Sequence, residues 1–229
     1  MLAVLYDVHG NLPALDAVLD DARSRGARRF ALGGDYALFG AWPVEVVDRL
    51  RGLDAAWIRG NGERWTATPD QAPGDPVVQG AIAACREALG DMVVAELAGL
   101  PETIADGDTR YWHGSPASDV RSFMPTPDDN ETDLLDGVEE SRLIFGHTHL
   151  PFRRIAMRGE RPVELVNPGS VGMPFDGDPR AAYALIAPDG TVEHRRLPYD
   201  HAASAAAVRE RFDGEWTATI ARRIEEARM

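Results

Sequence analysis

The chain has 229 residues, 44% of them apolar and 27% charged, which suits a soluble globular protein, and we expect residues 1–229 to form a single domain. The net charge is −13 and all 24 basic residues are arginines without a clustered basic patch, so no nucleic-acid partner is expected. The single cysteine, Cys85, excludes an intramolecular disulfide, and the absence of a long apolar stretch argues against a membrane partner and favours a cytoplasmic protein.

The first half of the chain alternates predicted strands with predicted helices. The predicted elements are, in order, a strand at 2–6, a helix at 13–25, a strand at 29–32, a helix at 43–50 and a strand at 55–58. The helix at 13–25 carries apolar residues at positions 15, 18, 19 and 22, which is helical spacing. Such alternation favours parallel βαβ units. A mostly helical stretch at 75–99 follows, with a break expected near Gly90.

The second half of the chain predicts hairpins. Predicted strands flank turn sequences at 106–108, 158–160 and 188–190, and a short strand is expected at 143–145. Cys85 lies in the helical stretch and is expected to be a buried structural thiol. Residues 201–229 are expected to form a C-terminal helix.

Acids, histidines and asparagines gather where the predicted strands end, beside glycines. The segments are Asp7-Val8-His9-Gly10-Asn11, Gly33-Gly34-Asp35, Arg59-Gly60-Asn61-Gly62-Glu63, His113-Gly114, Gly146-His147-Thr148-His149 and Asn167-Pro168-Gly169-Ser170. In parallel α/β sheets, sites form at the carboxyl ends of strands. Asp7 and His9 are two residues apart, as are His147 and His149, so in extended segments each pair would share one face. Carboxylate, imidazole and amide ligands suit Mn, Fe, Co, Ni or Zn.

Each segment also has a plain structural interpretation. Asp7 could cap a turn, His9 could be a loop histidine, and Asn11 could cap the helix that follows it. Residues 167–170 could form a tight turn that only supports His149, and Arg59 could be a solvated surface charge. Because six segments would all have to be coincidental, a common site is the better interpretation.

This ordered set of motifs resembles the calcineurin-like metallophosphoesterases, closest to their small bacterial phosphodiesterase-type branch. The match runs from residue 7 to about residue 200. The resemblance implies an α/β (α+β) fold in which two central mixed β-sheets, flanked by helices, form a four-layer αββα sandwich. It also implies two divalent metal ions, which could be Mn, Fe, Ni, Co or Zn. By analogy Asp35 would bridge the two ions, with the remaining ligands Asp7, His9 and His149 on one and Asn61, His113 and His147 on the other.

The resemblance further implies a dinuclear metal-dependent phosphoesterase. Such an enzyme would hydrolyse phosphodiester or phosphomonoester bonds of a small phosphoester substrate by attack of a metal-bridging hydroxide. The resemblance does not indicate an oligomeric state. Asp35, Asn61 and Arg59 are the expected catalytic residues, and the Arg59 guanidinium would stabilise charge on the phosphoryl oxygens. The alternative is a weak or inactive member of the same fold that acts as a binding scaffold.

One position departs from the family pattern. Most of the superfamily has G-N-H-D or G-N-H-E, whereas here Gly62 stands in place of the histidine and Glu63 follows it. The usual histidine–carboxylate pair cannot form, which favours the phosphodiesterase-type branch. A histidine introduced at position 62 is expected to raise monoesterase activity if the loop accepts it. The residues expected to support the ligands or contact substrate are Asn11, Gly62, Glu63, Asn167 and Ser170.

Overall fold

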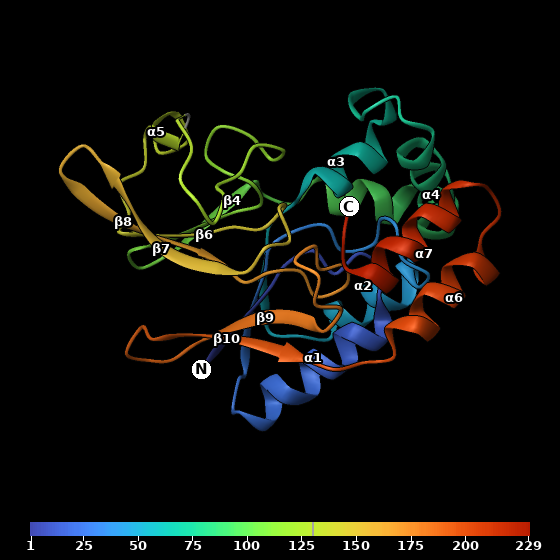
Figure 1. Ribbon diagram of the computed structural model, residues 1–229, viewed down its shortest axis with the longest axis horizontal. Helices are drawn as coiled ribbons and strands as arrows, with labels where there is room; N and C mark the ends of the chain where they lie inside the picture. Colours follow the sequence, from blue (N-terminus) through green and yellow to red (C-terminus); the bar gives the residue numbers. More distant parts are fainter. Residues whose placement is uncertain (130) are drawn as a thin grey trace.

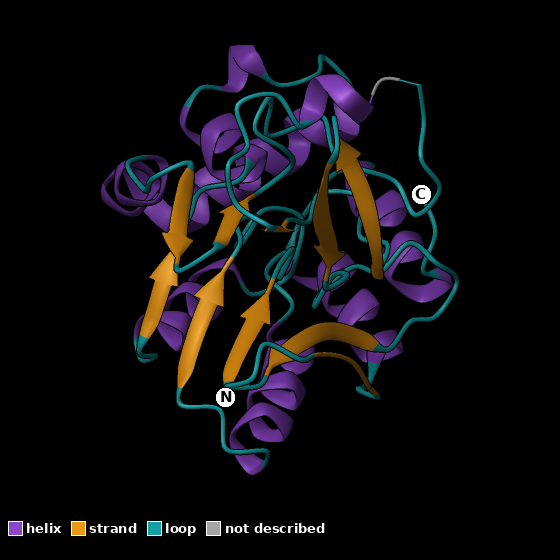
Figure 2. Cartoon of the chain, turned by 90° about the vertical axis from the view of Figure 1, so that its left-hand side faces the viewer, coloured by secondary structure: helices purple, strands orange, loops and turns teal. Residues whose placement is uncertain are grey.

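Two five-stranded mixed sheets lie at the centre of the molecule (Figure 1 and Figure 2). The computed structural model describes residues 1–129 and 131–229. The first sheet has the order β10-β9-β1-β2-β3, in which β1, β2 and β3 are parallel and β9 and β10 are antiparallel neighbours. Its strands are β1 (Leu2–Leu5), β2 (Arg29–Leu32), β3 (Ala55–Trp57), β9 (Ala181–Ile186) and β10 (Val192–Leu197).

The second sheet has the order β4-β5-β6-β8-β7. Here β5, β6 and β8 are parallel, while β4 and β7 pair antiparallel at the two edges. Its strands are β4 (Thr103–Asp106), β5 (Thr109–Trp112), β6 (Arg142–Ile144), β7 (Phe152–Arg158) and β8 (Arg161–Asn167). The hairpin turns predicted at 106–108, 158–160 and 188–190 are confirmed, because β4–β5, β7–β8 and β9–β10 are antiparallel pairs.

Helices cover the outer face of the first sheet. The described residues form seven α-helices and a short 3-10 helix at Pro69–Gln71. The α-helices are α1 (Leu12–Ser24), α2 (Pro43–Arg51), α3 (Asn61–Ala67), α4 (Pro76–Ala98), α5 (Glu131–Leu134), α6 (His201–Arg211) and α7 (Trp216–Glu226). The expected break in the long helix is confirmed, because Gly90 inside α4 has φ 72° and ψ 159°.

The alternation of side chains in β1 shows how the layers are built. Ala3 and Leu5 pack into the large core under the helices, which also buries Cys85, and Val4 packs into the core between the two sheets. Both faces of the strand are covered, which explains its continuous apolar sequence. Burial raises the pKa of the Cys85 thiol to about 12, as a structural cysteine requires.

The outer face of the second sheet carries a thinner layer. Phe123, Leu135 and Val138 lie in the segment around α5 and pack with Leu143 and Leu165 of the sheet. The four-layer αββα sandwich is therefore confirmed, with a helix of only four residues in the fourth layer.

The end of the chain differs from the single helix expected at 201–229. It forms two helices, α6 and α7, which pack against each other and leave residues 212–215 between them. Gly214 in this connection has φ 112°, a backbone conformation that an L-residue with a side chain rarely adopts, and the helix cannot continue through it. In the described residues no helix is long and apolar enough to span a membrane.

Candidate metal centre

The expected ligands follow parallel strands of both sheets. Asp7 and His9 follow β1, Asp35 follows β2 and Asn61 follows β3, all in the first sheet. In the second sheet His113 follows β5, and His147 and His149 follow β6. The fold brings these segments together in two groups, each with ligand atoms within 4.8 Å of one another, and Asp7 belongs to both: Asp7, His9 and His149; Asp7, Asp35 and His113.

Five of the seven expected ligands have left-handed backbones. Their φ angles are 55° at Asp7, 48° at His9, 57° at Asp35, 67° at His147 and 59° at His149. Among the other non-glycine residues that the structure describes, only Phe39 and Ala227 have a positive φ. The expectation that each pair lies in an extended segment is therefore wrong. Such conformations are uncommon outside glycine, and strained backbone gathers at functional sites in proteins.

Three histidines are held in the same orientation. The Nδ1 atoms of His9 and His113 lie 3.0 Å from the Leu38 carbonyl oxygen and 2.8 Å from the Gly33 carbonyl oxygen, and His149 Nδ1 lies beside the Met173 carbonyl oxygen. A carbonyl oxygen only accepts, so each Nδ1–H donates and each Nε2 keeps a free lone pair. Metal-ligating histidines are commonly fixed in this way.

The free lone pairs face one another at short distances. His9 Nε2 lies 3.1 Å from His149 Nε2, and neither nitrogen has a proton to share. Asn61 Oδ1 lies 3.0 Å from His113 Nε2 and 2.9 Å from His147 Nδ1. The contact between the two Nε2 atoms is repulsive unless a cation lies between them, whereas the Asn61 contacts depend on which way the amide is turned.

Asp7 has a buried carboxylate oxygen that also faces the histidines. Its Oδ1 is buried without a hydrogen-bond partner and lies 3.5 Å from His149 Nε2 and 3.9 Å from His113 Nε2. A half-turn of the Asn61 amide would let its nitrogen donate to His113 and His147. That turn would leave the His9–His149 contact and the Asp7 oxygen unsatisfied, whereas metal ions between these atoms satisfy all of them.

Asp35 faces both groups of ligands. Its Oδ2 lies 3.8 Å from His9 Nε2, and its Oδ1 lies 3.5 Å from His113 Nε2. The Gly62 backbone N–H donates to the same Oδ1 at 2.7 Å, which fixes the carboxylate in place. A carboxylate with one oxygen toward each group suits the bridging position that the resemblance implies.

Burial sets the protonation of the cluster. It raises the pKa of the Asp7 carboxyl to about 8, and it lowers the pKa of His9 to about 3 and that of His147 to about 4. Burial, followed by the nearby Glu63, also raises the pKa of Asp35 well above its usual range. The imidazoles of His9 and His147 are therefore neutral, and the two carboxyl groups lack a countercharge, which divalent cations would supply.

Four of the five supporting residues brace the loops through side-chain hydrogen bonds. The Glu63 carboxylate accepts from the backbone N–H groups of Asp35, Tyr36 and Gly60 at 2.7–2.8 Å. The Ser170 hydroxyl donates to the Asp7 carbonyl oxygen at 2.7 Å. These contacts fix the backbone on either side of the two carboxylate ligands.

Asn167 and Asn11 act further from the ligands. The Asn167 amide donates to Thr148 Oγ1 at 2.9 Å and its oxygen accepts from the Gly169 N–H, so it braces the loop that carries His147 and His149. Asn11 is the N-cap of α1, and its amide nitrogen donates to the Gly172 carbonyl oxygen and to the Tyr199 hydroxyl. Both residues support the site by joining loops.

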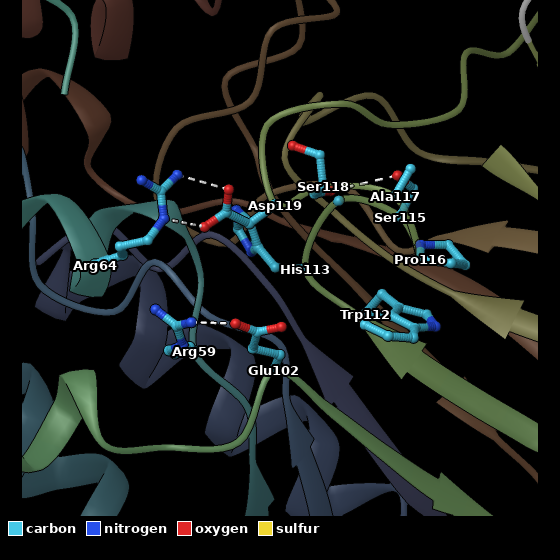
Figure 3. Close-up of a pocket in the computed structure, with 11 residues that line it drawn as sticks. Arg59, Arg64, Glu102, Trp112, His113, Ser115, Pro116, Ala117, Ser118 and Asp119 are labelled. Carbon is cyan, nitrogen blue, oxygen red and sulfur yellow. Dashed lines mark hydrogen bonds and ion pairs between the residues drawn. The ribbon is translucent and has the colours of Figure 1, made fainter. Parts of the chain in front are cut away.

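Arg59 lies in a separate cavity of about 240 Å³ that His113 also lines (Figure 3). Its guanidinium forms an ion pair with Glu102. In the same cavity Arg64 makes two hydrogen bonds to the Asp119 carboxylate, at 2.6 and 2.7 Å. The Arg59 guanidinium thus has a partner within the chain. It does not line the second, larger cavity, which five of the expected metal ligands line.

That larger cavity has a volume of about 730 Å³. Five expected ligands line it, namely His9, Asp35, Asn61, His147 and His149. Among its other lining residues are Phe175, whose ring stacks on His149 at 4.3 Å between centroids, and Arg223 of α7. Sequence reasoning missed both, since neither belongs to a motif and Arg223 looks like any other charge on an amphipathic helix.

Comparisons with known proteins agree with this geometry. Residues 1–190 match the model of the calcineurin-like phosphoesterase superfamily domain. An uncharacterised protein of Methanocaldococcus jannaschii is 30% identical over 221 residues, covering 87% of this chain and 88% of that protein. The structure of a metallophosphoesterase from Sphaerobacter thermophilus is 27% identical, with a TM-score of 0.81 over 99% of this chain and 98% of that one. A hypothetical protein from Pyrococcus horikoshii shares the fold at 21% identity, with a TM-score of 0.78 over 96% of this chain and 98% of that one.

Proposed function

The chain belongs to the calcineurin-like phosphoesterase superfamily, and we propose that it hydrolyses phosphate esters with two divalent metal ions. The observation that carries this proposal is the pair of buried lone pairs on His9 Nε2 and His149 Nε2, 3.1 Å apart, beside the Asp7 Oδ1 that has no hydrogen-bond partner. Unpaired acceptors at such distances, beside two buried carboxylates, are what a pair of cations requires.

The two carboxylates and the surrounding ligands divide between the ions. We assign His9 and His149, with Asp7, to one ion, and Asn61, His113 and His147 to the other, with Asp35 between them. Two bound ions would supply positive charge to the phosphoryl oxygens and lower the pKa of a water molecule. The chain fixes the proposed bridging ligand through two hydrogen bonds. Glu63 accepts from the backbone N–H of Asp35, and the Gly62 N–H donates to the Asp35 carboxylate.

Position 62 bears on the kind of ester. Gly62 offers no imidazole that could donate a proton to the leaving oxygen, so substrates whose leaving group departs without that help should react best. Diesters with an acidic alcohol fit this condition, and we propose that phosphodiesters are preferred to alkyl monoesters. The mono- versus diester ratio with p-nitrophenyl and bis-p-nitrophenyl phosphate measures this preference.

A binding scaffold that has lost turnover is the alternative. Such a protein would be expected to have lost ligands, whereas all seven expected ligands are present in this chain and all lie near the centre. The retained set favours an enzyme.

The test combines metal analysis with turnover. Protein purified without chelator is expected to contain Mn, Fe, Co, Ni or Zn, to hydrolyse bis-p-nitrophenyl phosphate, and to lose activity after chelation until a metal is returned. Asp35→Asn should lower turnover by on the order of a hundredfold or more while the protein stays folded, because the charge that faces both groups is removed. Asp70→Asn, at an exposed acid outside the ligand-bearing segments, is the control. Wild-type protein that binds no metal and shows no turnover with any of these ions would contradict the proposal.

A further inference from the structure

The large cavity beside the ligands holds much more than a phosphate group. Its volume of about 730 Å³ is that of a site for a drug-sized organic molecule. The ligands occupy one part of its lining, and most of the remainder is apolar, including Phe39, Trp65, Leu150 and Met173. An enzyme that needed only to bind a phosphoryl group would not require this apolar surface.

The far end of the chain contributes to the same cavity. Arg223 of α7 and the terminal Met229 line it together with the ligands. Both residues lie beyond residues 1–190, the part of the chain that matches the superfamily model.

Arg223 is unusual among the arginines of this chain. It makes no hydrogen bond or ion pair with any residue that the structure describes, although it is only partly exposed and its Nε is fully buried. The other unpaired arginines in the described residues are all exposed: Arg23, Arg28, Arg121, Arg222 and Arg228. Burying part of a guanidinium without a partner is costly, so this position points to a partner from outside the chain.

A second donor without a partner lies in the same wall. The indole N–H of Trp65 on α3 is buried and makes no hydrogen bond in the described part of the chain. Trp65 and Arg223 both line the cavity that the ligands line. The indole nitrogen is closed off from the cavity, so Trp65 offers an occupant the apolar surface of its ring rather than this N–H.

We propose that Arg223 binds an anionic oxygen of the substrate and that the apolar wall receives a bulky, mainly apolar group esterified to the phosphate. The inference rests on the proposed function and narrows its substrate class to phosphate esters of large apolar or aromatic alcohols. Arg121 also lines the cavity, but it is exposed to solvent, whereas Arg223 is half-buried and is therefore the guanidinium that we assign to the phosphoryl group. The apolar wall selects the ester. Arg59, paired with Glu102 in another cavity, does not compete for this role.

Calorimetry on manganese-loaded protein tests the inference with two phosphonates that cannot be hydrolysed. Methylphosphonate offers only the anionic group, and naphthylmethylphosphonate adds a large apolar group. The wild-type protein should bind the naphthyl compound at least about tenfold more tightly, because the apolar wall leaves water. Arg223→Gln should weaken the binding of both compounds by roughly tenfold or more, through loss of one charged hydrogen bond.

Arg222→Gln is the matched control, because Arg222 is the neighbouring residue on α7, exposed and without a partner in the described residues. It should bind both phosphonates like the wild-type protein. Metal content per chain is measured for all variants, and Arg223→Gln should retain its ions. If that variant loses its ions, Arg223 supports the centre rather than a ligand, and the inference is overturned.

The outcomes separate this inference from the proposed function. If wild-type protein hydrolyses bis-p-nitrophenyl phosphate but binds the two phosphonates equally, or if Arg223→Gln binds them like wild type, the inference fails and the proposed function stands. If wild-type protein shows the expected binding pattern but hydrolyses no ester with any metal, the proposed function fails, and the cavity is supported as a binding site for an apolar phosphate compound.

Discussion

At the scale of single residues, Gly62 is packed against a ligand. A Cβ atom built on Gly62 would lie 2.8 Å from Asp35 Oδ1 and 3.1 Å from Asp35 Cγ. The same Oδ1 accepts a hydrogen bond from the Gly62 N–H. The loop therefore has no room for the histidine considered at position 62 unless the Asp35 carboxylate moves. A side chain there acts first on the metal ligand and only then on the leaving group.

Gly62→Ala should lower the affinity for the metal ions by about 10- to 100-fold, because the added methyl group displaces a carboxylate that faces both groups of ligands. Gly62→His should likewise lose activity toward monoesters rather than gain it. Metal titration by calorimetry and turnover of p-nitrophenyl phosphate measure the two effects. The control is Gly52→Ala, where the nearest atom to a built Cβ lies at an ordinary 3.5 Å. Tighter metal binding or faster monoester turnover in either Gly62 variant would show that Asp35 adapts freely.

The identity of the ligands could be predicted from the sequence, but their backbone could not. The polar residues stand at strand ends beside glycines, and the family pattern assigns them in order. The left-handed conformations at Asp7 and His147 arise from contacts between distant loops, such as the hydrogen bond from the His147 N–H to Asp7 Oδ2 at 3.1 Å. Glu63 is a similar case, since the three N–H groups that it accepts from become neighbours only in the folded chain.

At the scale of elements, the C-terminal helices are part of the main core although they lie outside the matched domain. Ile220 and Ile224 of α7 are buried in the core that also holds α1, α2 and α4. α7 also packs against α4. The chain beyond residue 190 therefore contributes both to stability and to the wall of the large cavity.

Ile220→Ala should lower the free energy of unfolding by about 2–5 kcal/mol, because it removes a fully buried side chain and leaves a cavity. Ile155→Ala is the matched control: this isoleucine lies on the edge strand β7 and is 56% exposed, so its truncation should cost less than about 1 kcal/mol. Urea unfolding of the two variants gives the comparison. Equal losses would mean that α7 is only loosely attached to the core.

The elements themselves were largely predictable, because their periodicity and turn residues agree with the fold. The break between α6 and α7 was not predicted, although Asp213-Gly214 is a turn signal in an otherwise helical pattern. The helical pattern on both sides outweighed it, and only the packing of α6 against α7 shows that the chain must turn there.

At the scale of the whole molecule, the ligands connect the two sheets. Three of the ligand-bearing segments leave the first sheet and two leave the second, so an ion bound by His9 and His149 is held by both. The four-layer arrangement could be predicted only from the family resemblance. Hydrophobic periodicity indicates where strands lie, but it does not show how two sheets face each other. The charge of −13 adds to the demand for cations, since buried acids such as Asp7 gain from any local positive charge.

Manganese should therefore raise the free energy of unfolding of the wild-type protein by about 3 kcal/mol when its concentration is a hundred times the dissociation constant. The thermal midpoint should rise accordingly. Asp7→Asn should abolish this gain. Without metal the same variant should be at least as stable as wild type, because it removes a buried carboxyl group that has an oxygen without a partner. Scanning calorimetry with chelator and with manganese compares the four states. A metal-free variant much less stable than wild type would mean that Asp7 has a structural role of its own.

The left-handed backbone at the ligands also limits which sequences can occupy these positions at all. Asparagine, aspartate, histidine and glycine tolerate that conformation, whereas valine, isoleucine and threonine strongly resist it because of their branched Cβ. A library of random replacements at Asp7, His9, Asp35, His147 and His149, selected only for folding in the presence of chelator, should still be depleted of the branched residues. The residue types that remain at these positions would then reflect only what the left-handed backbone tolerates, because neither metal binding nor catalysis was selected.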